Sequence, residues 1–340
     1  MIELKRDGLV FSFPEVHKDA VLRIGFQRTL RIPDDGRDYD LPPGLGEFPL
    51  RHVDDFAGKV PAPWLEHGGV MLPMYQSEAL WIHFQAFHGQ DRAAAYPFAV
   101  KIAAGKINAV TGQQWSDGLR RRPQDYMAVP RQPWLDGYCV EKGIIRQFVA
   151  MPLGSGYSAE EQLTGAAEHG GLQIIVHPMK AEAFERRFPR IDHSTARMAR
   201  SIFHFHVPQE AMALAPGGRM RQEIYEDPYD FDEWDQAHSS RCFAHLANAL
   251  VWRAITGQAP PTVPPTAKEY TAAGLPWFKY YAEGANALAG SSVLQKVKSV
   301  VTKAAEKGDV ALPENESVTP EKVIQLREGL RKGQVREGVF

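Results

Sequence analysis

Apolar and polar residues alternate through much of the first half of the chain. Such alternation is typical of a strand that buries one face and exposes the other. Paired apolar runs around a glycine-containing turn indicate β-hairpins in two places. The pattern predicts strands or hairpins at residues 9–13, 21–32, 98–110 (hairpin), 138–151 (hairpin), 172–177 and 201–208.

From about residue 230 the spacing of apolar residues changes to that of a helix. Acidic residues open the segment 230–257 and Gly257 closes it, as they do in a capped helix, so one long helix is expected there. The segments 291–308 and 319–333 have the same periodicity. In the first of them valine, leucine and alanine form one stripe, with lysines outside it.

A proline-rich segment separates these two halves of the pattern. Residues 259–266 contain four prolines in eight positions, which favours an extended linker. We therefore expect an α+β fold: a β-rich, mainly antiparallel body over residues 1–258 that ends in a long helix, the linker at 259–266, and a helical C-terminal extension over 267–340. The apolar stripes of the extension must be buried on the body or on a second subunit, so a homo-oligomer held by the C-terminal helices is one expectation.

Composition and charge exclude several classes of protein. Lysine and arginine number 39 against 41 aspartates and glutamates, so no overall field draws the chain to nucleic acid or to an anionic membrane surface. No uncharged apolar run reaches the 18 residues of a membrane span, and the first eight residues lack the apolar core of a secretory signal. Cys139 and Cys242 fit no metal or redox spacing. We expect a soluble, cytoplasmic protein that binds neither nucleic acid nor membrane.

A glycine-rich turn at residues 154–159 is the first candidate site. Its sequence fits the relaxed dinucleotide pattern G-x-G-x-x-G/A between an expected strand and an expected helix, so Gly154, Gly156, Tyr157 and Ser158 are candidate cofactor-binding residues. The alternative is a structural turn. Ser158 and Glu161 have the spacing of a capping box, which would occupy the same N–H groups that a phosphate needs.

Two histidines and a glutamate form the second candidate site. His204 and His206 would lie on the same face of a strand, and Glu210 follows after three residues. The spacing H-x-H-x(3)-E-x(6)-G resembles the second part of the first cupin motif, a resemblance that covers 14 residues. It implies that His204, His206 and Glu210 bind a divalent metal. The alternative is that both histidines are ordinary solvated or hydrogen-bonded strand residues.

A neighbouring acid and base form the third candidate site. Glu168 and His169 stand beside a glycine pair just before an expected strand. A histidine titrates near neutral pH and can exchange protons with a carboxylate partner, so these two residues are candidates for acid–base catalysis. The alternative is a plain helix end at Gly170.

Aromatic residues are concentrated in the stretches 72–88 and 275–281, where they form part of the core or line a ligand pocket. Three functions remain open. The favoured hypothesis is a small-molecule-binding protein with an aromatic-lined pocket. The alternatives are a metal- or acid/base-dependent enzyme that uses residues within 160–235, and a structural subunit of an oligomeric assembly.

Overall fold

Strands are the main regular secondary structure, as the alternating pattern predicts. The computed structural model describes residues 1–87, 89, 94–189, 209–280, 282, 284–309 and 315–326. The strands in these ranges are β1 (Ile2–Lys5), β2 (Gly8–Ser12), β3 (Val21–Thr29), β4 (Asp38–Tyr39), β5 (Gly44–Glu47), β6 (Arg51–His52), β7 (Val70–Pro73), β8 (Ala79–Ala86), β9 (Phe98–Ala104), β10 (Ile107–Asn108), β11 (Met127–Val129), β12 (Trp134–Leu135), β13 (Gly137–Glu141), β14 (Ile144–Pro152), β15 (Leu172–Pro178), β16 (Gln209–Arg221), β17 (Ser240–Asn248), β18 (Trp277–Tyr280) and β19 (Val323–Leu326).

Both expected hairpins form. Strand β9 pairs with β10 across a turn at Gly105 and Lys106, whose φ angles are both positive (56° and 57°). Two consecutive positive φ angles are the signature of the type I′ turn, whose twist matches that of the flanking strands. Strand β13 pairs with β14 across a turn in which Gly143 has a φ of 75°. Gly143 therefore supplies the positive φ angle of this turn, which glycine adopts without steric cost.

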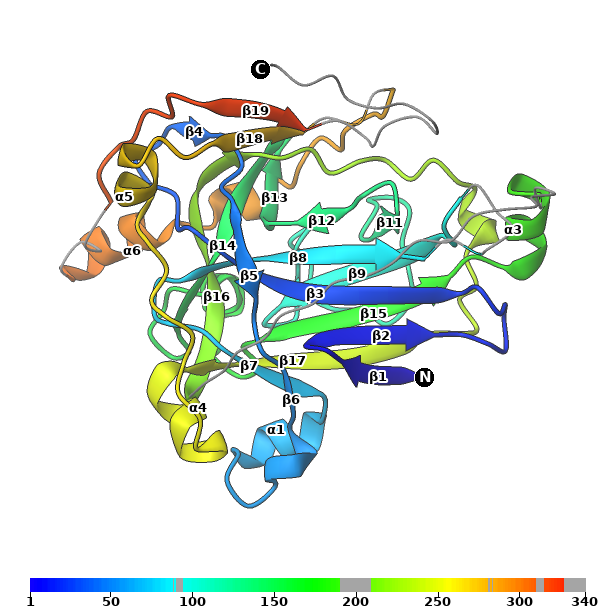
Figure 1. Ribbon diagram of the computed structural model, residues 1–340, viewed down its shortest axis with the longest axis horizontal. Coiled ribbons are helices and arrows are strands. Elements are labelled where there is room, and N and C mark those ends of the chain that lie inside the picture. Colours follow the sequence, from blue (N-terminus) through cyan, green and yellow to red (C-terminus); the bar gives the residue numbers. More distant parts are fainter. Residues whose placement is uncertain are drawn as a thin grey trace, which may run out of the picture.

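One large sheet connects β1 to β17. Its main path is antiparallel throughout and runs β1–β2–β3–β8–β14–β16–β17–β15–β9–β11. Parallel pairing occurs where β4 joins β16 and β7 joins β17. In Figure 1, β14 and β16 run across the direction of β3, β8, β9 and β15. The β-rich, mainly antiparallel body is thereby confirmed.

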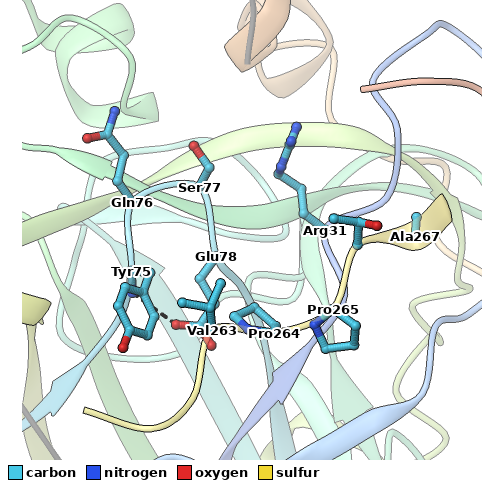
Figure 2. Close-up of a pocket in the computed structure, with 10 residues that line it drawn as sticks. Arg31, Tyr75, Gln76, Ser77, Glu78, Val263, Pro264, Pro265 and Ala267 are labelled. Carbon is cyan, nitrogen blue, oxygen red and sulfur yellow. Dashed lines mark hydrogen bonds between the residues drawn. The ribbon is translucent and has the colours of Figure 1, made fainter. Parts of the chain in front are cut away.

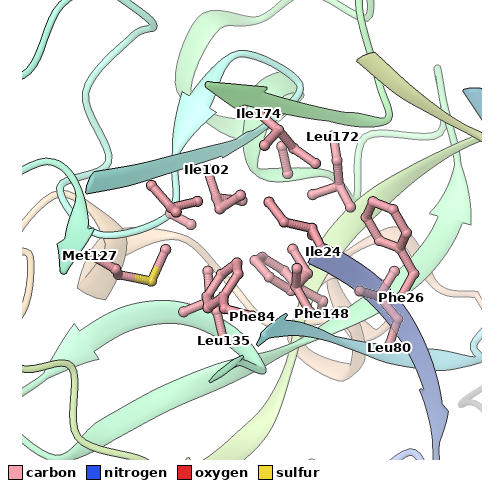
Figure 3. Packing of buried hydrophobic residues seen from close by; sticks show 14 of the residues in the cluster. Ile24, Phe26, Leu80, Phe84, Ile102, Met127, Leu135, Phe148, Leu172 and Ile174 are labelled. Carbon is pink, nitrogen blue, oxygen red and sulfur yellow. The ribbon is translucent and has the colours of Figure 1, made fainter. Parts of the chain in front are cut away.

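The core lies between two halves of this sheet. Side chains from β3, β8 and β14 meet side chains from β9 and β15, and Figure 3 shows Ile24 and Phe148 among them. These side chains are fully buried, because each strand directs alternate residues to the same face. Ile102 and Ile174 lie directly opposite each other on β9 and β15, and both enter this core.

The prediction of one long helix over residues 230–257 is wrong. The structure has a short 3₁₀ turn, η2 (Phe231–Glu233), then strand β17, and only afterwards helix α4 (Ala249–Thr256). Asn248 caps α4 by accepting the N–H groups of Leu250 and Val251, and Gly257 ends it with a φ of 72°. The predicted end of the helix is therefore correct and its predicted start is not. The physical reason is that β17 pairs with β15, which is remote in sequence.

The remaining helices are short. They are η1 (Asp54–Phe56), α1 (Ala62–His67), α2 (Ala159–Thr164), α3 (Ala181–Arg187), α5 (Ala267–Ala272), η3 (Leu294–Lys296) and α6 (Val300–Lys307). Among the described residues after 266, the expectation of a helical C-terminal extension is met at α5, η3 and α6. Strand β19 lies inside the segment 319–333, where a helix was expected, and it pairs in parallel with β18. None of the helices in the described ranges has the length and the apolar run that crossing a membrane requires.

The C-terminal part packs on the body. Leu41 and Phe278 exchange two backbone hydrogen bonds of 2.9 Å, which fasten β18 to the segment between β4 and β5. In Figure 1, β18 and β19 lie beside β4. From the apolar stripe of 291–308, Val300 and Ala304 are buried against a cluster that includes Val149 of β14. Oligomerisation through the C-terminal helices stays a prediction.

Candidate functional site

Backbone N–H groups of the glycine-rich turn donate to a carboxylate of the same chain. Ser158 Oγ accepts the N–H of Glu161 at 3.1 Å and so caps α2. The Glu161 carboxylate accepts the N–H of Gly156 at 2.6 Å and that of Ser158 at 3.2 Å. These are the groups that a phosphate would need, and they already have an anionic partner. The capping box of the sequence analysis is confirmed.

Tyr157, in the same turn, faces the C-terminal part. Its hydroxyl donates to the Asp309 carboxylate, and the Lys307 ammonium lies 4.8 Å from the centre of its ring. The neighbouring Gly154 has a φ of 87°, which favours glycine, and open space around its Cα. The four candidate cofactor-binding residues are therefore brought together. The contacts of Tyr157 join this turn to the last residue of α6 and to Asp309.

Glu168 and His169 are also brought together. Glu168 Oε2 lies 3.7 Å from His169 Nε2, in the loop that leads from α2 to β15. The buried carboxylate of Glu160 accepts the backbone N–H groups of Glu168, His169 and Gly170 at 2.8–3.0 Å. Glu160 thus fixes the path of this loop and the position of the His169 side chain.

His169 lies in a pocket with two further histidines, which we call the histidine pocket. It has a volume of about 240 Å³, and His67, Glu168, His169, His245 and Trp64 contribute to its walls. The ring of His67 lies 6.1 Å from that of His169 and 6.4 Å from that of His245. His245 is sandwiched between Trp64 and Phe243, with ring centres 4.7 Å and 4.3 Å away.

Hydrogen bonds define where these histidines carry their protons. His67 Nδ1 lies 2.5 Å from the Pro63 carbonyl and His245 Nε2 lies 3.0 Å from the Gly68 carbonyl. A carbonyl only accepts, so each of these nitrogens is the protonated one. Burial lowers the pKa of His245 to about 4, and burial also lowers the pKa of His169. The two histidines are therefore neutral at pH 7, which is the form that a base requires.

Of the three predicted metal ligands, Glu210 lies within the described residues. His204 and His206 lie outside the described residues, as does the strand expected at 201–208, and Glu210 falls near the start of β16. Within the described ranges, no group of three or more histidine, cysteine, aspartate or glutamate side chains is arranged to hold a metal ion. A divalent metal at His204, His206 and Glu210 stays a prediction.

A second pocket lies where the two aromatic-rich stretches of the sequence meet. We call it the aromatic pocket. It has a volume of about 220 Å³, and its walls are Leu41, Pro42, Pro43, Gly44, Trp81, Trp134, Asp136, Phe278 and Leu326. Trp81 stands nearly perpendicular to Trp134, with ring centres 6.2 Å apart and an interplanar angle of 71°. Phe278 enters from β18, because the backbone pairing with Leu41 brings that strand over the body.

Asp136 is the one charged residue in the wall of the aromatic pocket. It is 4 % exposed and follows β12 directly. The side chain of Gln222 forms two hydrogen bonds with Asp136. Gln222 Nε2 donates to Asp136 Oδ2 at 2.5 Å, and the backbone N–H of Asp136 donates to Gln222 Oε1 at 3.0 Å. Burial raises the pKa of Asp136 to about 7, and hydrogen bonds from Gln222 and Trp134 oppose this rise.

A third pocket, of about 160 Å³, lies under the proline-rich segment. Figure 2 shows Tyr75 and Glu78 beside Val263 and Pro264. The Tyr75 hydroxyl donates to the Pro261 carbonyl at 2.8 Å, and the Arg28 guanidinium donates to the Thr262 carbonyl. The proline-rich segment is therefore bound to the body by side-chain donors. This pocket lies where that segment meets the body, and burial raises the pKa of Glu78, in its wall, to about 7.

Sequence reasoning found part of each site. It placed Trp81 and Phe278 in aromatic stretches that could line a pocket, but it did not single out Trp134 or Asp136. Compared with known proteins, the chain matches no family model, no curated protein and no solved structure. The function must therefore be argued from the geometry of these pockets.

Proposed function

We propose that the protein binds a small organic molecule in the aromatic pocket. The observation that carries the proposal is the meeting of Trp81, Trp134 and Phe278, from three separate strands, around a cavity of about 220 Å³. Ligand sites are mostly apolar concave surfaces with a few polar groups that fix orientation. The aromatic pocket has this composition, since its wall combines three aromatic rings with the single carboxyl of Asp136.

The aromatic pocket can be blocked without removing any of its rings. A Cβ added at Gly44 would lie 3.3 Å from the Trp81 indole, and Gly44 is exposed, so a leucine there fills the cavity rather than disturbing the core. Gly58 is a matched control, because a Cβ at that position meets nothing within 4 Å. Both positions lie outside the set of glycines that have positive φ.

The test is a titration with indole, followed by ligand-observed NMR and by tryptophan fluorescence. We expect saturable binding to the native chain and to Gly58→Leu, and loss of binding in Gly44→Leu. Binding that survives Gly44→Leu unchanged would assign the probe to another surface. If the native chain does not bind indole or the two probes used in the next subsection, the proposal is wrong.

A second candidate function is acid–base catalysis in the histidine pocket. The observation in its favour is that His67, His169 and His245 share one cavity with Glu168. In this proposal neutral His169 removes a proton from an attacking water, and Glu168 stabilises the imidazolium that results. We expect hydrolysis of p-nitrophenyl acetate that is lost in His169→Gln and retained in His52→Gln, which changes an exposed histidine of β6. Equal rates in both variants would exclude His169 as the base.

A further inference from the structure

The buried acidic residues differ sharply in how their charge is balanced. Eight are buried in the part of the chain that the structure describes: Asp7, Asp40, Glu78, Asp125, Asp136, Glu160, Asp227 and Glu233. Six of them form ion pairs with arginine or lysine, at distances from 2.5 to 3.5 Å. Glu160 has none but accepts three backbone N–H groups. In the same described part, Asp136 has no basic partner either.

Among the described residues, two buried carboxyls, Glu160 and Asp136, therefore have no basic partner, and Asp136 is the one of the two that lines a described pocket. A buried carboxylate that has no cation is destabilised by several kcal/mol, which is why such groups are normally paired. The nearby basic residues do not serve this purpose. Lys279, which follows Phe278, and Arg221, which precedes Gln222, both pair with Asp40.

The aromatic rings of the pocket also favour a cation. The faces of tryptophan and phenylalanine carry negative potential, so several rings around one cavity attract a cation. Trp81 and Trp134, which both line the aromatic pocket, stand at 71° to each other with ring centres 6.2 Å apart. Two nearly perpendicular indoles form two walls of an aromatic cage. Such cages bind compact ammonium groups.

We propose that the aromatic pocket selects an organic ammonium ion, with Asp136 as its counter-charge and Trp81 and Trp134 as its walls. This inference rests on the proposed function and adds the chemical class of the ligand. Gln222 acts as a positioning residue, because its amide holds both the backbone and the carboxyl of Asp136.

The test compares two probes of the same shape, choline and its uncharged carbon isostere 3,3-dimethyl-1-butanol. Affinities are measured by calorimetry on the native chain, Asp136→Asn, Trp134→Leu and the surface control Asp117→Asn, whose residue is exposed. We expect the native chain and Asp117→Asn to bind choline at least about tenfold more tightly than the isostere. Asp136→Asn should bring this ratio close to one while the isostere still binds.

The outcomes separate the inference from the function on which it rests. If both probes bind the native chain equally well, the aromatic pocket exists as a ligand site and the ammonium inference is wrong. If neither probe binds, and indole also fails, the proposed function falls with it. Trp134→Leu keeps the inference testable should Asp136→Asn fail to fold, because losing one wall of the aromatic cage should also abolish the preference for choline.

Discussion

Arg28 Nε lies 2.8 Å from Glu78 Oε1, and the two side chains are only 9 % and 1 % exposed. This buried ion pair also binds the proline-rich segment, since the Arg28 guanidinium donates to the Thr262 carbonyl. Removing one partner leaves an uncompensated charge in the interior, which typically destabilises a protein by several kcal/mol. The pair therefore connects the stability of the body to the attachment of the segment after it.

The first prediction concerns this ion pair. Glu78→Leu should lower the free energy of unfolding by about 4 kcal/mol, because Arg28 is left buried and unpaired. The double variant Arg28→Met with Glu78→Leu should recover at least half of that loss, since no charge remains. Urea unfolding of the three proteins measures both effects. A double variant no more stable than the single one would contradict the assignment of the loss to the unpaired charge.

The second prediction concerns the cap of α2. Ser158→Ala removes the acceptor of the Glu161 N–H and should lower the free energy of unfolding by about 1 kcal/mol. Thermal unfolding measures the change. Ser292→Ala, at an exposed serine, is the control and should leave the melting temperature unchanged. An equal effect in both variants would mean that the hydroxyl of Ser158 does not stabilise the helix.

The third prediction concerns Glu160 and the loop it holds. Glu160→Gln replaces an acceptor of three N–H groups by an amide that has one oxygen, so about 2 kcal/mol of stability should be lost. The amide exchange of His169 and Gly170 should become faster as well, which NMR can follow. Glu182→Gln, at an exposed position on α3, is the control for the change of charge. Unchanged exchange at His169 would count against this role of Glu160.

The fourth prediction concerns pH and His245. Burial lowers the pKa of His245 to about 4 from the ordinary 6.5, so between these values the unfolded chain binds the proton and the folded chain does not. Stability should therefore fall as the pH drops from about 6.5 towards 4, by up to about 3 kcal/mol from this residue. His245→Phe should unfold with a correspondingly weaker pH dependence. Parallel curves for the two proteins would refute the shift.

The fifth prediction concerns pH and Asp136, where the sign is reversed. Burial raises the pKa of Asp136 to about 7 from 3.8, so the folded chain holds this proton more tightly than the unfolded chain. Its contribution to stability is present at low pH and is lost as the pH rises from about 4 through 7. Asp136→Asn should therefore gain stability relative to the native chain between pH 5 and pH 8, by about 3 kcal/mol. A constant difference across this range would show that Asp136 keeps an ordinary pKa.

Local signals explain which parts of the fold could be predicted. The hairpins were found because glycine marks turns and alternation marks strands, and both properties lie within a few adjacent residues. Strand β17 was missed for an equally clear reason. Residues 243–247 are all buried, so the strand has no alternation, and its cysteine, histidine and leucine coincide with helical spacing. Pairing with β15, β16 and β7 determines its conformation.

The candidate sites differ in the same way. Contacts between neighbours in sequence could be predicted, and contacts between residues far apart in sequence could not. The capping box of Ser158 lies within four residues and was predicted correctly. The aromatic pocket assembles residues 41, 81, 134, 278 and 326, and no spacing in the sequence connects them. Likewise, Glu168 and His169 could be noticed as neighbours, whereas His67 and His245 reach the same cavity only because α1 and β17 are brought together.

The pairing of Leu41 with Phe278 has a consequence for how the chain acquires its aromatic pocket. These two residues pair although most of the described sequence lies between them. Contacts between residues so far apart in sequence form slowly during folding. During synthesis, Trp81 and Trp134 therefore leave the ribosome long before the strand that will cover them. Until Phe278 arrives, the two indoles lack this part of their cover, and apolar surface that is exposed in a partly folded chain favours aggregation.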